Sequence, residues 1–252
     1  MNPAHIEVKK LFSQKQFMIY KNIYMKKLFI VLIISLFVMQ SCVTSLQPLA
    51  TYDTAIVDDR LAGTWNSDGQ DYEVQKFFDS DLFKYIKKEM DKYKGNADKE
   101  LSEKEMEDFA PMLYFKSYVI KYTKNKIEYV MFGSMVKLNG QFFINFAPID
   151  INTDKNKEQA FEITSTDRLA THTIARVQFT NSNTVKLDFI DGGFLYDQVK
   201  AGRMKIKNER NDLYDTFLIT ASTSELQQFL EKYGTDSRFF NKETSVILNR
   251  KS

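Results

Sequence analysis

The stretch "VKLNGQFFINF", Val136–Phe146, decides the fold class. Two apolar, partly alternating runs flank Asn139-Gly140. Both central residues of a tight hairpin turn adopt positive φ, and asparagine followed by glycine is the preferred pair for that position. Alternation with a period of two residues places successive side chains on opposite faces of a strand. The stretch therefore predicts an antiparallel β-hairpin within a β-rich domain.

Alternating apolar and polar residues recur on both sides of this hairpin. The run 126–138 is long enough for two strands bent near Gly133-Ser134. About eight to ten strands with few helices predict a mainly β fold, either an antiparallel β-barrel or a strongly curved sheet, with helices covering one end. Further strands are expected at 72–75, 118–122, 171–180, 183–191, 204–210, 215–222 and 244–250.

Three segments have helical rather than alternating patterns. Residues 79–110 are expected to form a helical insertion between strands, because apolar residues in its first half recur mainly at spacings of three and four. A short helix is expected at 192–202. Another is expected at 222–234, where Ser222 and Glu225 have the spacing of a capping box.

The only cysteine of the chain follows a short apolar run in "MKKLFIVLIISLFVMQSC", Met25–Cys42. The run covers Leu28–Met39 and is too short to span a bilayer, since a transmembrane helix needs roughly 20 apolar residues. Two lysines, an apolar core and a small residue before the cleavage point are typical of a secretory signal. An uncleaved anchor helix and a buried core segment are the alternatives.

These residues resemble the lipoprotein signal peptide of Gram-negative bacteria. In that family a peptidase cuts directly before the cysteine, whose thiol receives a diacylglycerol and whose new amine is often acylated. The resemblance implies cleavage between Ser41 and Cys42, acylation of Cys42 with chains such as palmitate, and attachment to the lipid bilayer. The preferred motif has a small residue two positions before the cysteine, and Gln40 departs from it.

The sorting signals of such lipoproteins concern the residues after the cysteine. In some groups, acidic residues there direct export to the cell surface, and here no acid precedes Asp53. In others an aspartate directly after the cysteine retains the protein at the inner membrane, and Val43 stands at that position. The resemblance therefore implies anchoring in the outer membrane, facing the periplasm.

These features divide the chain into segments. Met25 with its two lysines forms a complete signal, so residues 1–24 are interpreted as sequence upstream of the true start, with a genuine long n-region as the alternative. Residues 25–41 form the lipoprotein signal peptide. Residues 42–60 have no clean period and are expected to form a tether, which leaves 61–252 as one β-rich domain.

Gly63 and Trp65 in "LAGTW" resemble the Gly-x-Trp entry motif of lipocalin-like domains. In that family the tryptophan closes the barrel floor and a basic side chain from the last strand stacks on it. The matching position in "VILNRK" is Arg250, and the second and third motifs of the family are not evident. The resemblance implies a lipocalin-like barrel with Trp65 largely buried and Arg250 within roughly 6 Å of its ring. An ordinary tryptophan at the surface of a strand is the alternative.

A second likeness covers most of the mature chain. Uncharacterised bacterial lipoproteins share a lipidated cysteine, a Leu-x-Gly-x-Trp motif, an "HTxxRV" motif and a late "TASTxELQxFL" helix. The corresponding residues here include His172, Arg176 and the segment 220–230. This likeness implies no activity.

Charge argues against nucleic acid as a partner. The chain has 35 basic and 33 acidic residues. Residues 1–41 hold six lysines and one glutamate, so 29 basic and 32 acidic residues remain after processing. A mature net charge of −3 without a basic stripe does not match the electrostatic footprint of nucleic-acid binding.

Residues that carry chemistry are sparse. Only His5 and His172 could provide imidazole, and His5 lies upstream of the signal, so no metal site is expected. His172 lies in a strand pattern and is interpreted as a hydrogen-bonded structural residue, with a catalytic or ligand-binding role as the alternative. Phosphate-loop and nucleophile-elbow motifs are missing from the sequence, so no cofactor is expected.

The sequence therefore predicts a non-enzymatic, membrane-anchored lipoprotein. Two roles stay open: a barrel that binds an apolar small ligand, and a subunit that docks on an envelope protein. The first predicts a dry apolar cavity and the second an apolar surface patch. The alternative is an envelope hydrolase, which predicts a cleft where several acids, His172 or a serine meet.

Overall fold

The computed structural model describes residues 43–94, 112–124, 127–149, 171–211 and 216–251. The chain divides into two units, residues 1–41 and 42–252, and all described residues belong to the second. The expectations for the upstream segment, the signal peptide, the second half of the helical insertion and the loop after residue 150 lie outside the described residues.

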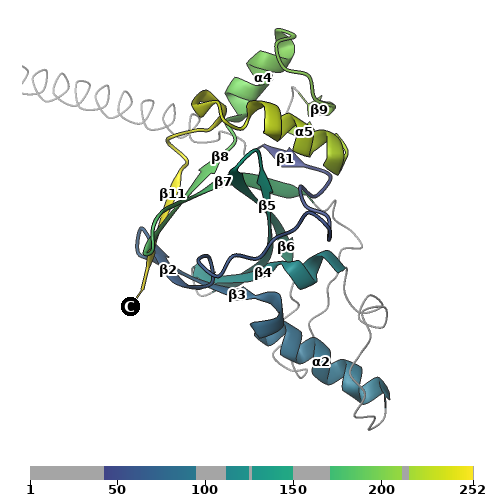
Figure 1. Cartoon of the computed structure of the whole chain (residues 1–252), viewed down its shortest axis with the longest axis vertical. Coiled ribbons are helices and arrows are strands. Elements are labelled where there is room, and N and C mark those ends of the chain that lie inside the picture. Colours follow the sequence, from purple (N-terminus) through teal and green to yellow (C-terminus); the bar gives the residue numbers. More distant parts are fainter. Residues whose placement is uncertain (1–42, 95–111, 125–126, 150–170, 212–215, 252) are drawn as a thin grey trace, which may run out of the picture. The chain divides into compact units, whose positions relative to one another are not determined.

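Eight antiparallel strands form a closed barrel, which Figure 1 shows as a ring. Strands β2 to β8 pair in chain order, and β11 closes the ring by pairing with both β8 and β2. The predicted antiparallel barrel is therefore confirmed. Its strands are β2 (Gly63–Ser67), β3 (Gln70–Lys76), β4 (Tyr118–Lys124), β5 (Ile127–Leu138), β6 (Gln141–Ile149), β7 (His172–Asn181), β8 (Thr184–Phe189) and β11 (Val246–Arg250).

The β5–β6 hairpin has the predicted turn, with φ of 45° at Asn139 and 77° at Gly140. The predicted division of 126–138 into two strands is wrong, because β5 continues unbroken through Gly133. A Cβ at Gly133 would meet the tips of the Ile120 and Ile144 side chains at 2.9 and 3.0 Å. A larger residue at this position would therefore have to displace these two side chains inside the barrel.

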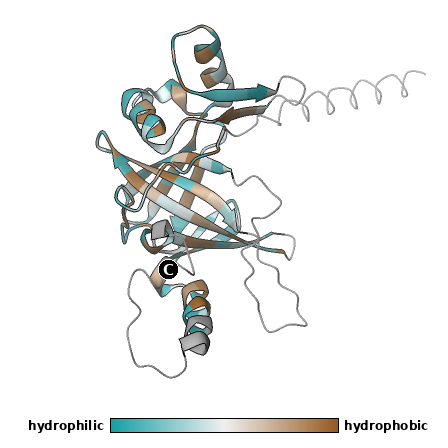
Figure 2. Ribbon diagram, turned by 90° about the vertical axis from the view of Figure 1, so that its right-hand side faces the viewer, coloured by the Kyte–Doolittle hydropathy of each residue, from teal (hydrophilic) through white to brown (hydrophobic). Residues whose placement is uncertain are grey.

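Side chains alternate between the inside and the outside of the barrel, as the banding of the strands in Figure 2 shows. We call the end where β2 begins and β11 ends the floor, and the end where β2 ends and β11 begins the mouth. The buried interior is apolar. Its members are Leu61, Trp65, Val74, Tyr118, Ile120, Met135, Ile144, Ala175, Val177, Val185, Leu187 and Leu248.

Part of the predicted helical insertion packs on the outer wall of β4 and β5. Helix α2 (Asp81–Lys94) follows the short 3-10 helix η1 (Phe77–Asp79), and η2 (Met112–Lys116) leads back into β4. The Ser80 hydroxyl accepts a 3.1 Å hydrogen bond from the Phe83 N–H and so caps the start of α2. The contact is made by Phe77, Leu82, Phe115, Val119, Val130 and Phe132.

A second group of elements, which we call the annex, packs on the outer wall of β5, β6 and β7. It includes β1, and its remaining elements form the insertion between β8 and β11. The helices were expected over one end of the barrel, but the outward-facing Val136, Phe143 and Ile174 place this contact on the wall. The annex comprises β1 (Thr44–Ser45), α4 (Gly192–Lys200), β9 (Asn208–Asn211), β10 (Thr216–Ile219), α5 (Thr223–Tyr233) and η3 (Ser237–Phe239).

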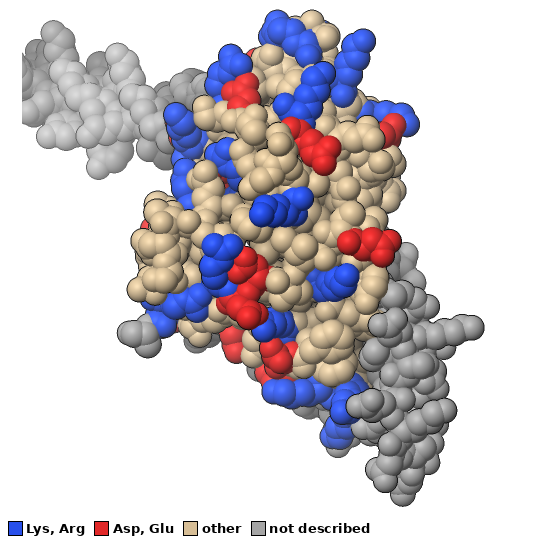
Figure 3. Space-filling view, viewed as in Figure 1, with Lys and Arg blue, Asp and Glu red and all other residues tan. Residues whose placement is uncertain are grey.

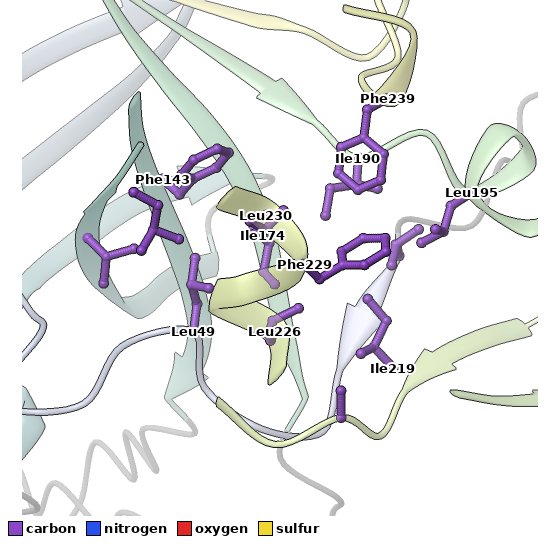
Figure 4. Close-up of a cluster of buried hydrophobic side chains, with 14 of the residues drawn as sticks. Leu49, Phe143, Ile174, Ile190, Leu195, Ile219, Leu226, Phe229, Leu230 and Phe239 are labelled. Carbon is purple, nitrogen blue, oxygen red and sulfur yellow. The ribbon is translucent and has the colours of Figure 1, made fainter. Parts of the chain in front are cut away.

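Both predicted helices of the annex are present, and α5 begins with the predicted capping box between Ser222 and Glu225. Figure 4 shows Leu226, Phe229 and Leu230 of α5 within the buried cluster that joins the annex to the barrel. The predicted strand 204–210 is shorter than expected and begins at Asn208. On the face in Figure 3, charges of both signs are interspersed over the barrel, while lysine and arginine are more frequent toward α4 and β9.

The predicted tether at 42–60 is wrong for the residues described, 43–60. Val43 is 2% exposed, and Leu49, Ala50 and Ala55 are also buried. The Leu49 N–H donates a 2.7 Å hydrogen bond to Asn145 Oδ1 on β6. The buried residues do not fall on one face of a helix or strand, so the segment has no period although it is packed. We call residues 43–60 the lead segment.

Candidate functional site

The floor of the barrel is built around Trp65. Its side chain is fully buried, and its indole Nε1 donates a 2.9 Å hydrogen bond to the Leu61 carbonyl. Arg250 lies opposite Trp65 in the β2–β11 pair, and its Cζ is 4.2 Å from the ring centroid. The burial and the cation–π contact predicted from the Gly-x-Trp resemblance are both present.

Backbone carbonyls hold the Arg250 guanidinium over the indole. Its Nη1 donates to the Ala62 carbonyl at 2.9 Å and its Nη2 to the Arg60 carbonyl at 2.6 Å, while Nε reaches the Ser182 carbonyl at 3.4 Å. A planar guanidinium can cover an aromatic face while its edge makes these bonds. Gly63 has a φ of 137°, and a Cβ there would collide with Arg250 Nη1. This collision gives the physical reason for glycine in the motif.

Arg60 covers the neighbouring part of the floor. Its Cζ lies 3.9 Å from the Phe179 ring and 5.6 Å from the Phe142 ring. Its ion pair with Asp58 has an N–O distance of 2.6 Å, and hydrogen bonding by this guanidinium lowers the pKa of the Asp58 carboxyl. The Tyr118 hydroxyl donates to the Asp58 carbonyl at 3.0 Å, and burial raises the pKa of Tyr118 to about 12. Sequence reasoning missed both Arg60 and Tyr118, since neither lies in a motif.

Above this floor the barrel encloses a cavity of about 500 Å³. Most of its lining is aliphatic or aromatic, and the exposed Asp68 and Lys124 show that it opens at the mouth. The apolar lining consists of Leu61, Val74, Ile120, Met131, Ile144, Phe146, Leu187, Phe189, Val246 and Leu248. The polar lining consists of Ser67, Asp68, Gln70, Tyr72, Tyr122, Lys124 and Thr173.

Tyrosines form a row across β3, β4 and β5 near the mouth. Tyr72 pairs with Tyr122, and Tyr122 pairs with Tyr129. The ring centroids are 5.5 and 4.9 Å apart, and the second pair is stacked. Burial raises the pKa of Tyr72 and of Tyr122, so both hydroxyls stay neutral at physiological pH. They are neutral hydrogen-bonding groups at the upper edge of an apolar chamber.

His172 does not line this cavity. It begins β7 and pairs with Ser45 of the annex, while its neighbour Thr173 faces the interior. Its Nδ1 lies 3.2 Å from the side-chain amide nitrogen of Asn145, and burial lowers the pKa of the imidazole. The arrangement agrees with the structural interpretation of His172. Cys42 and Ser41 lie outside the described residues.

Arg176, the arginine of the "HTxxRV" motif, belongs to an ionic cluster on the outer wall. Its Nη2 lies 2.8 Å from Asp188, which also binds the Lys186 amine and the Ser245 hydroxyl, each at 2.7 Å. Burial raises the pKa of Asp188, but these three hydrogen bonds outweigh that effect and lower it. The Arg176 guanidinium also lies 4.0 Å from the Phe240 ring. The cluster joins β7 and β8 to the segment that leads into β11.

No family model, curated protein or solved structure matches this chain. Within the described part of the chain, no group of three or more histidine, cysteine or acidic residues is placed to hold a metal ion. No helix among the described residues is both long and apolar enough to cross a membrane. The cavity and the signal-like sequence before residue 43 are therefore the features that bear on function.

Proposed function

We propose that the protein is a bacterial lipoprotein, anchored in the outer membrane through acylated Cys42 and facing the periplasm, whose barrel binds a small apolar or amphiphilic molecule without chemical change. The observation that carries the binding role is the cavity of about 500 Å³ inside the barrel, whose lining is mostly apolar. Small-molecule sites are typically concave, mostly apolar and between about 300 and 1,000 Å³, with a few polar groups that orient the ligand.

The distribution of apolar surface favours this role over that of a docking subunit. In the parts of the chain that the structure describes, the large exposed apolar side chains are Val57, Phe78, Ile127, Tyr129 and Ile247. They come from four separate segments, whereas a protein-docking face usually gathers such residues into one patch. An accessible group of apolar side chains is instead found in the lining of the cavity.

Neighbouring residues of β11 provide a matched test. Val246 lines the cavity, while Ile247 points outward and is 51% exposed. Val246→Asp places a carboxylate in the apolar chamber, and Ile247→Asp places the same group in solvent on the same strand. Binding is measured with a fluorescent polyene fatty acid that accepts excitation energy from Trp65, the only tryptophan.

We expect saturable energy transfer with the wild type, at least a tenfold loss of affinity with Val246→Asp, and little change with Ile247→Asp. Thermal unfolding of both variants separates a loss of binding from a loss of fold. Absence of binding by the wild type, or equal losses in two folded variants, would contradict the proposed role. Mass spectrometry of molecules that co-purify with the protein then identifies the natural ligand.

A further inference from the structure

We infer that the annex carries a second binding site, a groove between residues 202–207 and helix α5 that holds an acidic peptide segment of a protein partner in extended form. The groove has a volume of about 910 Å³, and none of the described residues that line it also lines the barrel cavity. The inference therefore goes beyond the proposed function and does not rest on it. Recognition at this groove depends on charge rather than on an exposed apolar patch.

The two walls of the groove run in opposite directions along nearly equal lengths. At one end the Tyr233 hydroxyl donates a 3.5 Å hydrogen bond to the Arg203 carbonyl. At the other end Lys207 Nζ lies 2.8 Å from Glu225 Oε1. The first wall spans at most about 13 Å between these contacts, and α5 rises about 12 Å between them. The groove therefore has the length of about four extended residues.

The first wall has a basic side chain at every second position. Arg203, Lys205 and Lys207 are exposed. Met204 and Ile206, which lie between them, are buried and half-buried. Alternate side chains of an extended segment lie on the same face, roughly 6.6 Å apart. The basic groups therefore form a row with the spacing that acidic residues have at alternate positions of an extended peptide.

The lining of the groove has an excess of positive charge, in the part of the annex where Figure 3 shows lysine and arginine to be frequent. Its charged members are Arg203, Lys205, Lys207, Lys232 and Glu225, which give a net charge of +3. Glu225 pairs with Lys207. The other three residues make no ion pair within the described part of the chain. Because complementary charge governs the choice of partner, the segment that this groove fits is acidic.

An apolar floor favours a peptide over an anionic membrane surface. Val199, Met204, Ile206 and Phe229 line the groove together with the Tyr233 ring. Apolar side chains of a peptide enter such a concave floor, whereas the phosphate groups of a flat bilayer reach only the basic rim. The long stems of lysine and arginine let their charged ends meet carboxylates above the floor.

The backbone beside the groove adds main-chain donors. Among the residues that the structure describes, the N–H groups of Lys205 and Ile206 donate no hydrogen bond, and the segment leads directly into β9, which ends the strand order of the sheet. Extended peptides bond their main chain to such unpaired groups, and their alternate side chains give specificity. The groove therefore fits a peptide with acidic residues at alternate positions and apolar residues between them.

A pair of defined peptides tests the class of ligand. The probe is a fluorescein-labelled peptide of three glutamates alternating with two leucines, and its counterpart has lysine in place of glutamate. Fluorescence anisotropy should show saturable binding of the acidic peptide by the purified protein, and at least tenfold weaker binding of the lysine peptide. Replacing the leucines of the acidic peptide by serine should weaken its binding at least threefold, because the apolar floor then loses its contacts.

Charge reversal on both walls tests the location. Lys205→Glu combined with Lys232→Glu should bind the acidic peptide at least tenfold more weakly than the wild type, and the lysine peptide more tightly. Lys87→Glu combined with Lys88→Glu is the control, since both lysines are exposed on α2 and the change in net charge is the same. Equal losses in the two double variants, or no binding of the acidic peptide by the wild type, would overturn the inference.

Two further measurements separate the remaining outcomes. Binding of the polyene fatty acid by the barrel should be unchanged in both double variants, which shows that each is folded. A wild type that binds the acidic peptide but no fatty acid would contradict the proposed function and leave the groove in place. A wild type that binds phosphatidylglycerol vesicles but not the peptide, with the vesicle binding lost on charge reversal in the groove, would overturn the peptide and assign this surface to the membrane.

Discussion

Replacing Arg250 by alanine should lower the free energy of unfolding by about 2–3 kcal/mol. The guanidinium lies 4.2 Å from the Trp65 ring, and such cation–π contacts contribute roughly 1 kcal/mol at partly exposed sites. Its bonds to the carbonyls of Arg60 and Ala62 are charge-assisted, and each contributes roughly 1.5 kcal/mol or more. Since water can reach both carbonyls after truncation, we take about half of that value for each bond.

Urea unfolding followed by Trp65 fluorescence measures this loss, because Trp65 is the only tryptophan. For a domain of this size the denaturant dependence is about 2–3 kcal/mol per molar urea, so the midpoint should fall by about 1 M. The emission of the folded variant should also shift to longer wavelength, because one face of the indole loses its cover. Arg250→Lys keeps the charge but not the planar fork, and should recover less than half of the loss.

Lys251→Ala is the matched control for this measurement. Lys251 is the next residue, and its ion pair with Asp71 is exposed on both sides. Exposed pairs contribute about 0–1 kcal/mol, so the midpoint should change little. An Arg250→Ala midpoint within about 0.2 M of the wild type, or full stability of Arg250→Lys, would refute the account of the floor.

Three further predictions concern other parts of the chain. Gly63→Ala should lower the free energy of unfolding by about 2–3 kcal/mol, because φ is 137° and the new Cβ collides with the Arg250 guanidinium. Gly69→Ala is the control: its φ is 79° but the Cβ meets open space, so the loss should be only about 1 kcal/mol. Calorimetry measures both losses. The pKa of the Asp188 carboxyl is lowered on folding, so its carboxylate stabilises the fold above the unfolded pKa of about 4, and this stabilisation is lost as pH falls through the folded pKa. Asp188→Asn should therefore flatten the dependence of the unfolding free energy on pH below about pH 4. An unchanged dependence would contradict the ionic role of the cluster. Cys42→Ser should abolish metabolic labelling with an alkyne fatty acid, and equal labelling of both forms would refute acylation at this residue.

The barrel could be predicted from sequence because its signals are local. Asn139-Gly140 sets a turn that requires two positive φ values, and a period of two residues marks the strands around it. The Trp65–Arg250 contact could be predicted only through a family resemblance, since the two residues are 185 positions apart and no local pattern links them. Closure of the ring through β11 is likewise nonlocal, because the annex lies between it and β8.

The residues that line the cavity could not be predicted from local signals alone. Once Trp65 is known to face inward, alternation assigns an inward set to β2, but the other strands need their registers, which depend on pairing across the ring. No sequence pattern indicated a role for Arg60. It precedes the first barrel strand in a segment without a period, and its role depends on the Phe142 and Phe179 rings from two distant strands.

The lead segment shows the same limit. It runs from Thr44, which pairs with Thr173, to the floor, where the Asp58 carbonyl accepts a hydrogen bond from the Tyr118 hydroxyl. Leu49 and Ala55 are buried between these points. The contacts of this segment are made with strands that lie far along the chain, so they leave no period in its own sequence, and only the folded barrel reveals that it is packed.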